Sequence, residues 1–238
     1  VFVRSALPVP QFPASVVRPF DFDHDGDIDL FIGSRVKKGI FPYANHSWLL
    51  INNNGKLTAD TTFRLNLGMV TDAIWTDYDK DGWEDLLVAR EWNSLVIIKN
   101  IKGKELAPPI LPELEAKHGI WYSLVSGDFD QDGDDDYIVG NLGDNHRFNI
   151  SDKYPLNLYA IDLDPDGTRD PVMTSYWKDK NGKMTEYPVN YLDELWSQSK
   201  FLKAKCPDYT TFSYLSFKEM LDEKIQQRHS HLIFCSED

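Results

Sequence analysis

Short apolar runs rich in β-branched residues recur along the chain, and an acidic segment interrupts each pair of them. The runs SVVRPF, VTDAIWT, WYSLVSG and LNLYAI precede such a segment, and LFIGS, LLVARE, YIVGN and PVMTSYW follow one. Short runs of β-branched and aromatic residues bounded by Gly or Pro are typical of β-strands. The pattern therefore predicts four strand pairs, each joined by an acidic loop.

Further strand pairs are expected between and after these loops. Asn54-Gly55 in SWLLINNNGKLTAD and Asn181-Gly182 in PVMTSYWKDKNGKMTEYPV are strong hairpin turns. The segment SLVIIKNIKGKEL resembles a third such pair. There is thus room for the remaining strands of a four-stranded sheet around the first loops.

The pattern becomes helical near the C-terminus. Residues 191–205 and 211–227 have helical periodicity and are separated by Cys206-Pro207-Asp208. We expect a helical pair at 190–230 that caps or inserts into the β domain of residues 1–189. The tail, 231–238, has no recognisable pattern.

The four acidic segments share one motif, D-x-D-x-D-G-x-x-D, whose first Asp lies at 21, 77, 128 and 162. Four complete copies make chance a poor explanation. Strand pairs recurring about every 50 residues, with the loop in the same register each time, are typical of a β-propeller and favour it over a sandwich. We expect an all-β-dominant propeller with about four recognisable blades and a C-terminal helical pair.

The charge of the chain is concentrated in these loops. The net charge is −13, and the four windows 21–29, 77–85, 128–136 and 162–170 hold 20 of the 38 acidic residues but only two basic ones, Lys80 and Arg169. Such crowding requires a counter-charge. An acidic chain repels phosphate backbones, so we expect no nucleic-acid partner. We also expect no membrane span, because no apolar run approaches the roughly 20 residues that one needs.

The loop spacing suits a hard divalent cation. Ca²⁺ takes six to eight oxygen ligands, and carboxylates at positions 1, 3 and 5 of a tight loop can converge on it while Gly at position 6 permits the turn. The carbonyl of position 7 and the carboxylate of position 9 would complete the shell. The chain would hold about four Ca²⁺ ions, one per loop. The expected ligands are Asp21, Asp23, Asp25, Asp27, Asp29, Asp77, Asp79, Asp81, Trp83, Asp85, Asp128, Asp130, Asp132, Asp134, Asp136, Asp162, Asp164, Asp166, Thr168 and Asp170.

Two alternatives to calcium stay open, Mg²⁺ and an ion-free acidic turn. Mg²⁺ is less suited because it prefers a smaller octahedral shell and keeps its waters. Helix–loop–helix calcium sites are excluded, because they need Glu at position 12, where this chain has Ile32, Val88, Val139 and Met173.

The loops, with following segments such as DLFIGSR, DLLVAREW and DYIVGNLG, resemble the FG-GAP/VCBS repeats of integrin-α-like propellers. The stretch GMVTDAIWTDYDKDGWEDLLVAREW, the segment NLGDN and the region through 228 are more specifically similar to bacterial ASPIC/UnbV, cartilage-acidic-protein-like VCBS-repeat proteins. The resemblance implies Ca²⁺ in the loops, an extracellular, cell-surface or periplasmic location and a binding role. Integrin-type propellers have seven blades, whereas four loops account for about four. The alternatives are an incomplete ring in a truncated chain, blades too degenerate to recognise, or self-association through an open blade edge.

The sequence favours a binding protein over an enzyme. It contains no G-x-S-x-G, H-E-x-x-H or C-x-x-C motif and no glycine-rich phosphate loop. We therefore expect a calcium-binding adhesion module whose ions are structural and whose ligand is a protein or a glycan. The alternatives are a propeller enzyme acting on glycans at the channel mouth, or a purely structural module of a longer envelope protein.

Four aromatic residues are candidates for contact with such a ligand. Trp83, Trp92, Trp121 and Tyr122 could together form a platform for a sugar or a protein. The alternative is that they pack between neighbouring blades. The two cysteines, Cys206 and Cys235, allow one disulfide at most.

Overall fold

The computed structural model describes residues 6–110, 118–143, 147–148, 150–163, 167, 169–221 and 230–234. The chain divides into two compact units, which are described separately. The first comprises Val1–Lys38 and Tyr43–Asn141, and the second comprises Gly39–Pro42 and Leu142–Asp238. The fourth acidic loop therefore belongs to the same unit as the helices, whereas the first three loops belong to the other unit.

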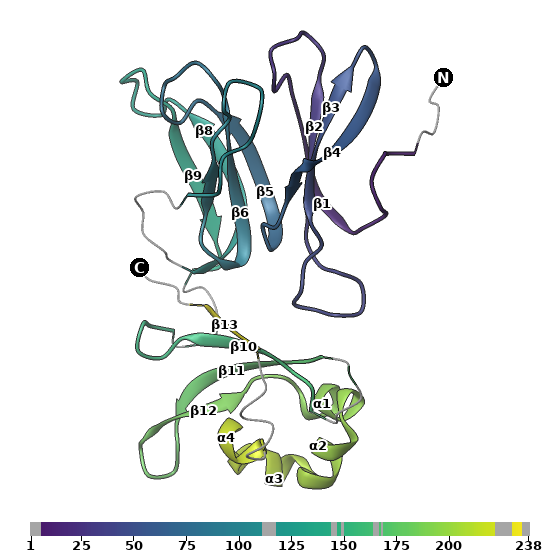
Figure 1. Cartoon of the computed structure of the whole chain (residues 1–238). Helices are drawn as coiled ribbons and strands as arrows, with labels where there is room; N and C mark the ends of the chain where they lie inside the picture. The colour runs from purple at the N-terminus through teal and green to yellow at the C-terminus, as the bar shows by residue number, and fades with distance from the viewer. Residues whose placement is uncertain are drawn as a thin grey trace, which may run out of the picture. The chain divides into compact units, whose positions relative to one another are not determined.

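The first sheet of the first unit contains four antiparallel strands in the order β1-β2-β3-β4 (Figure 1). The strands are β1 (Ala14–Phe20), β2 (Asp29–Ser34), β3 (Ser47–Asn53) and β4 (Lys56–Leu65). The first acidic loop joins β1 to β2, as predicted. The predicted hairpin at Asn54-Gly55 is confirmed between β3 and β4, where both turn residues have positive φ, 53° and 82°.

The second sheet has the order β5-β6-β8-β9, with β7 paired to β6. Its strands are β5 (Met69–Thr76), β6 (Asp85–Asn93), β7 (Val96–Ile98), β8 (Gly119–Gly127) and β9 (Asp136–Asn141). The start of β6 pairs with β7, and its end pairs with β8. The second loop joins β5 to β6 and the third joins β8 to β9. The strand pair predicted in 94–106 is reduced to β7 and an isolated bridge between Asn100 and Leu106.

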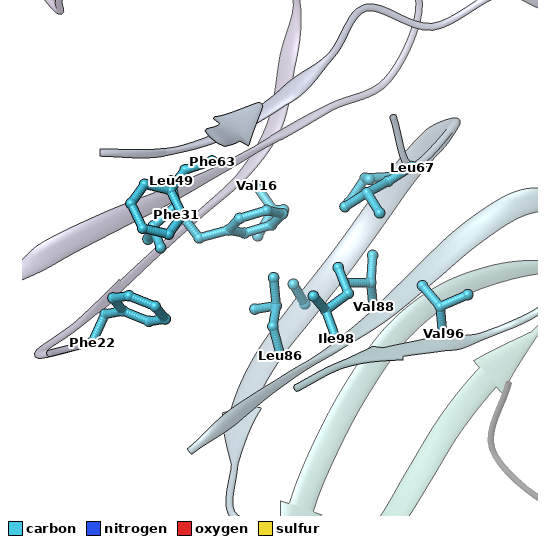
Figure 2. Close-up of a cluster of buried hydrophobic side chains, with 12 residues drawn as sticks. Val16, Phe22, Phe31, Leu49, Phe63, Leu67, Leu86, Val88, Val96 and Ile98 are labelled. Atoms are coloured by element: carbon cyan, nitrogen blue, oxygen red, sulfur yellow. The ribbon is translucent and has the colours of Figure 1, made fainter. Parts of the chain in front are cut away.

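Strand β6 lies between two hydrophobic cores. Leu86 and Val88 join a cluster that includes Phe22, Phe31 and Leu49 from the first-sheet side. Figure 2 shows the side chains of the two sheets facing each other in this cluster. The intervening residues of β6 belong to a second cluster with Leu124 of β8. A strand buried on both faces explains why LLVARE is apolar without strict alternation.

The second unit contains one antiparallel sheet in the order β12-β11-β10-β13. Its strands are β10 (Leu156–Ile161), β11 (Asp170–Lys178), β12 (Met184–Pro188) and β13 (Ser230–Phe234). The fourth loop joins β10 to β11, and the predicted turn at Asn181-Gly182 joins β11 to β12. The tail differs from the prediction, because β13 pairs antiparallel with β10. A lone five-residue run with no partner nearby in the sequence gives no strand signal.

The helical region has four short helices where the periodicity predicted two. These are α1 (Leu192–Gln198), α2 (Lys200–Lys205), α3 (Tyr209–Tyr214) and α4 (Phe217–Met220). Ser199 and Ser216 begin new helices because their side chains accept hydrogen bonds from Leu202 N and Glu219 N. The helices pack on the sheet through a core that joins Leu192, Leu195 and Phe217 to β10 and β11. Residues 222–227 of the second predicted helix lie outside the described residues.

The fold is all-β with four short helices, and its antiparallel sheets are consistent with propeller blades. Within the described part of the chain, no sheet closes into a barrel, which fits an incomplete ring. None of the described helices has the length and apolarity to cross a membrane.

Candidate metal sites in the acidic loops

The backbone of the first three acidic loops turns through two left-handed positions. Position 6 is glycine in all four loops, as predicted, with φ between 85° and 94°. Position 4 is also left-handed in the first three loops, although it is not glycine, with φ of 58° at His24, 60° at Lys80 and 65° at Gln131. The turn draws the odd-numbered positions of the loop together.

Backbone amides hold the first carboxylate of every loop in the same orientation. The N–H of the position 6 glycine donates to Oδ2 of the position 1 Asp in all four loops. The pairs are Gly26 with Asp21 at 3.0 Å, Gly82 with Asp77 at 2.9 Å, Gly133 with Asp128 at 3.1 Å and Gly167 with Asp162 at 3.3 Å. One oxygen is thereby fixed, and the position of the other follows from it.

The position 9 carboxylate ties the end of the loop to its beginning. Its Oδ2 accepts from the N–H of position 2 in the first, third and fourth loops. The pairs are Asp29 with Phe22 at 2.8 Å, Asp136 with Phe129 at 3.0 Å and Asp170 with Leu163 at 2.9 Å. In the second loop, Asp85 accepts from Asn100 N through Oδ1 at 2.9 Å. Position 9 therefore stabilises the loop as well as bringing negative charge to it.

In three loops the carboxylates converge on a common point. The triads are Asp21, Asp23 and Asp29; Asp77, Asp79 and Asp81; and Asp128, Asp130 and Asp136. Within each triad, one oxygen from each residue lies within 4.8 Å of the others. Two oxygens on opposite sides of a Ca²⁺ ion are separated by about twice the 2.3–2.6 Å ligand distance, so this spacing suits calcium.

Two buried carboxylate oxygens in these loops lack hydrogen-bond partners. They are Oδ1 of Asp21 and Oδ2 of Asp85, neither of which has a partner among the described residues. Such atoms are costly to bury unless something cationic or donating meets them. The all-oxygen donor set and these unsatisfied atoms fit a hard divalent cation.

Burial and crowding make the charged form of several loop carboxylates unfavourable. Burial raises the pKa of Asp85 to about 6. Burial likewise raises the pKa of Asp29 and of Asp23, with Asp25 adding to the shift at Asp23. These directions are those expected when burial disfavours the charged form of a carboxylate and other carboxylates lie nearby. A bound cation would restore their ionised form.

Two lysines supply part of the counter-charge. Lys99 forms an ion pair with Asp79 of the second loop, which raises the pKa of Lys99. Lys80 of the second loop pairs with Asp134 of the third. The sequence analysis missed Lys99, which lies outside the repeat and is brought to the loop by the pairing of β7 with β6.

Contacts between loops order them further. His24 of the first loop stacks on Trp83 of the second, with ring centroids 4.2 Å apart and planes 9° from parallel. His24 Nε2 also lies 3.3 Å from Oε2 of Glu84. The first three loops are therefore linked in a row, first to second and second to third.

Several expected ligands lie outside the triads. Asp25, Asp81 and Asp132 at position 5 each accept a hydrogen bond from the N–H of position 7, and of these only Asp81 joins a triad. Asp27 accepts from Asn54 N at 2.5 Å. In the fourth loop, Asp164, Asp166 and Thr168 lie outside the described residues, as does Cys235.

The four aromatic candidates occupy different environments. Trp92 is only 7% exposed. Trp121 packs against the core cluster of β6 and β8. Trp83 stacks on His24, and Tyr122 is exposed. Of the four, Tyr122 is thus the most exposed residue.

Comparison with known proteins identifies the repeats. A family model described as FG-GAP-like repeat matches residues 21–88 and 77–139, which together span the first three loops and half of the chain. A search of curated proteins and a search of solved structures found no match. On the strength of the two matches, the chain belongs to the family of FG-GAP-like repeat proteins.

Proposed function

We propose that the chain is a calcium-binding recognition module of propeller type that works outside the cell or in the cell envelope, and that its ions are structural. The observation that carries the proposal is the convergence of three carboxylates in each of three loops, together with unsatisfied buried oxygens in two of them. Membership of the FG-GAP-like family supports it. The closer resemblance to bacterial ASPIC/UnbV, cartilage-acidic-protein-like proteins is part of this proposal.

The carboxylates would hold Ca²⁺, which supplies positive charge and no other chemistry. The position 6 amide orients the first carboxylate, and the position 9 carboxylate closes the loop against position 2. With the ion bound, the attraction of each carboxylate to the cation outweighs the repulsion among the carboxylates. The two strands that flank each loop are thereby held in register. The role of the ion would thus be to stabilise the fold. We propose in addition that the protein binds a protein or glycan ligand in adhesion and is not an enzyme.

The proposed location agrees with the affinity that such a module would have. Extracellular calcium modules bind with Kd of roughly 10⁻⁴–10⁻³ M, which suits a calcium-rich environment outside the cell. In the first three loops, the residues at positions 4 and 5 are exposed, so an ion bound there could exchange with such a solution. An envelope or secreted setting is therefore the one in which these sites would be filled.

Thermal unfolding in EGTA, in millimolar CaCl₂ and in millimolar MgCl₂ tests the proposal. At 10 mM calcium, about 100 times a Kd of 10⁻⁴ M, each site that binds only the folded state adds about 2.7 kcal/mol to the free energy of unfolding. We expect a large rise in Tm specific to Ca²⁺. An unchanged Tm in calcium, combined with no calcium in the purified protein by elemental analysis, would show that the loops are ion-free turns.

A further inference from the structure

The three repeats of the first unit pack on one another with the same positions in contact each time. Position 11, counted on from the loop, is Phe31 in the first repeat and Leu87 in the second, and each lies in a core cluster with residues of the following repeat. Position 2 does the same at Phe22 and Tyr78. We call this side of a repeat its forward face.

The opposite side of a repeat, its rear face, meets the repeat before it. Position 10 is Leu86 in the second repeat and Tyr137 in the third, and both pack in clusters with the preceding repeat. The residue four places before the loop follows the same rule, since Ala73 packs in the first cluster and Leu124 in the second. Each junction therefore joins a forward face to a rear face.

The acidic loops meet in the same order, with position 4 of one loop against positions 7 and 8 of the next. At the first junction His24 stacks on Trp83 and lies 3.3 Å from Glu84. At the second junction Lys80 forms an ion pair with Asp134. Position 4 thus belongs to the forward face, and positions 7 and 8 belong to the rear face.

The forward face of the third repeat is apolar and exposed. Phe129 at position 2 is 52% exposed, and Ile138 at position 11 is 59% exposed. Val125, which pairs with Ile138 across β8 and β9, is 53% exposed. Gln131 occupies position 4 and is exposed as well. At both internal junctions, the residues at positions 2 and 11 pack in a core.

The rear face of the first repeat has the same character. Val17, four places before the loop, is 48% exposed, and Ile28 at position 8 is 52% exposed. Leu30 at position 10 is half-buried, and Asp27 occupies position 7. The first unit therefore exposes one forward face and one rear face, the two kinds of surface that pack together at its internal junctions.

We propose that copies of this chain associate head to tail, with the forward face of the third repeat in one copy packed on the rear face of the first repeat in the next. Phe129 and Ile138 cover Val17 and Leu30, and the side-chain amide of Gln131 donates to Asp27. A second copy fits because it carries the rear face that the register of the internal junctions requires. The contact is heterologous and uses sheet faces rather than an open blade edge. The inference goes beyond the proposed recognition function and does not depend on it.

Sedimentation velocity of the full chain in CaCl₂ tests the inference. The faces are small, so we expect a transient contact with a Kd of about 10–100 µM. Single chains should therefore associate as their concentration rises through this range. Ile138→Asp and Val17→Asp each place a charge on one of the two faces, and each variant should remain a single chain. Ile101→Asp, the same change at an exposed residue outside both faces, should associate like the native chain.

Mixing the two blocked variants distinguishes a head-to-tail contact from a symmetric one. Val17→Asp keeps the forward face and Ile138→Asp keeps the rear face, so an equimolar mixture should form pairs and nothing larger. A blocked variant that associates alone, or a mixture that does not pair, would overturn the inference. A native chain that stays single at every concentration would do the same.

Gln131→Lys tests the contact between the loops by a gain that misfolding does not imitate. A lysine is accepted at position 4, because φ is 60° at Lys80 and 65° at Gln131. An ion pair with Asp27 should tighten the association about twofold to fivefold, as expected of an exposed pair. Adding Asp27→Asn should abolish the gain. No gain, or a gain that survives Asp27→Asn, would overturn the inferred register.

Thermal unfolding at concentrations where the chains are separate shows whether one chain leaves its forward face open. Ile138→Asp should then unfold close to the native Tm, whereas Leu87→Asp, at the equivalent buried position, should lower it strongly because it buries a charge. Equal losses would show that another part of the same chain covers the face, which would overturn the inference. The calcium dependence of the native Tm tests the proposed function separately, so either proposal can fail without the other.

Discussion

At the scale of single residues, Gly103 marks a close approach between a turn and the first two acidic loops. Its φ is 69°, and a Cβ atom there would lie 2.5 Å from Cα of Asp23 and 3.0 Å from Cζ3 of Trp83. No side chain fits without moving the loop backbone. The turn that contains Gly103 is therefore part of what fixes the position of the first loop.

Gly103→Ala should lower the free energy of unfolding by more than strain alone explains. Adopting a positive φ costs an alanine about 1–2 kcal/mol, and forcing atoms into a packed space adds about 1–3 kcal/mol. Gly55→Ala is the matched control, because Gly55 has φ of 82° and open space around its Cβ position. Urea unfolding measures both. Equal losses in the two variants would mean that Gly103 has no tight contact in solution.

The carboxylate triads make a second prediction at this scale. Asp130→Asn removes one charge from the third triad and should reduce the calcium-induced gain in the free energy of unfolding by about one site's share, about 2.7 kcal/mol at 100 times Kd. The calcium-induced rise in Tm should shrink accordingly. Asp60→Asn, which alters an exposed carboxylate outside the loops, should leave the rise intact. Calorimetric scans with and without CaCl₂ provide the measurement. A full calcium response in Asp130→Asn would exclude this triad as a site.

The repeat made some of these residues predictable and others not. Positions 1, 3, 6 and 9 follow from the spacing of Asp and Gly, because the local turn alone brings them together. Lys99 and the stacking of His24 on Trp83 depend on which strands and loops become neighbours. Which strands and loops become neighbours is determined by tertiary packing, and a local sequence motif carries no information about it.

At the scale of elements, equivalent positions of the four repeats are buried to different extents. Position 11 of the motif is Phe31 in the first repeat and Leu87 in the second, and both are buried in core clusters. The same position in the third repeat is Ile138 on β9, which is 59% exposed. Val125 and Phe129 of the third repeat are also exposed. The face of the β8–β9 hairpin therefore carries the apolar residues of an inter-blade face.

In the fourth repeat, helices cover the equivalent positions. Position 2 is Leu163 and position 11 is Val172, and both lie in one cluster with Leu192, Leu195 and Phe217 of the helices. The helices thus bury the face that a following blade would bury in a propeller. Hydrophobic periodicity predicted a helical region here, but not its division into four short helices, which depends on the caps at Ser199 and Ser216.

Paired truncations test this register argument. Leu87→Ala, at a position 4% exposed, should lower the free energy of unfolding by about 2–5 kcal/mol. Ile138→Ala, at the equivalent exposed position, should lower it by about 0.5 kcal/mol or less. Chemical denaturation of both variants in CaCl₂ gives the comparison. A loss at Ile138 as large as that at Leu87 would show that this face is covered in solution.

At the scale of the whole molecule, the acidic loops determine the charge. The chain outside the four loops has 23 basic and 18 acidic residues, so the net charge of −13 arises in the loops. Repulsion within each loop opposes folding when no ion is bound. Calcium would relieve that repulsion in both units, since the fourth loop lies in the unit with the helices.

The number of bound ions distinguishes a chain in which every repeat binds calcium from one in which the fourth has lost it. The fourth loop keeps the amide bond from Gly167 to Asp162 that all the other loops have, and the bond from Leu163 to Asp170 that the first and third loops have, so we expect about four Ca²⁺ ions, one per loop. Native mass spectrometry of the full chain in dilute CaCl₂ counts them directly. Asp162→Asn should bind one ion fewer than the native chain, as should Asp77→Asn, whereas Asp60→Asn should match the native count. Three ions in both the native chain and Asp162→Asn would confine calcium to the first three loops.

The four ions together would bring the net charge from −13 to −5. Most of the electrostatic cost of folding this acidic chain would then be removed by calcium, which makes its stability a function of the calcium concentration around it.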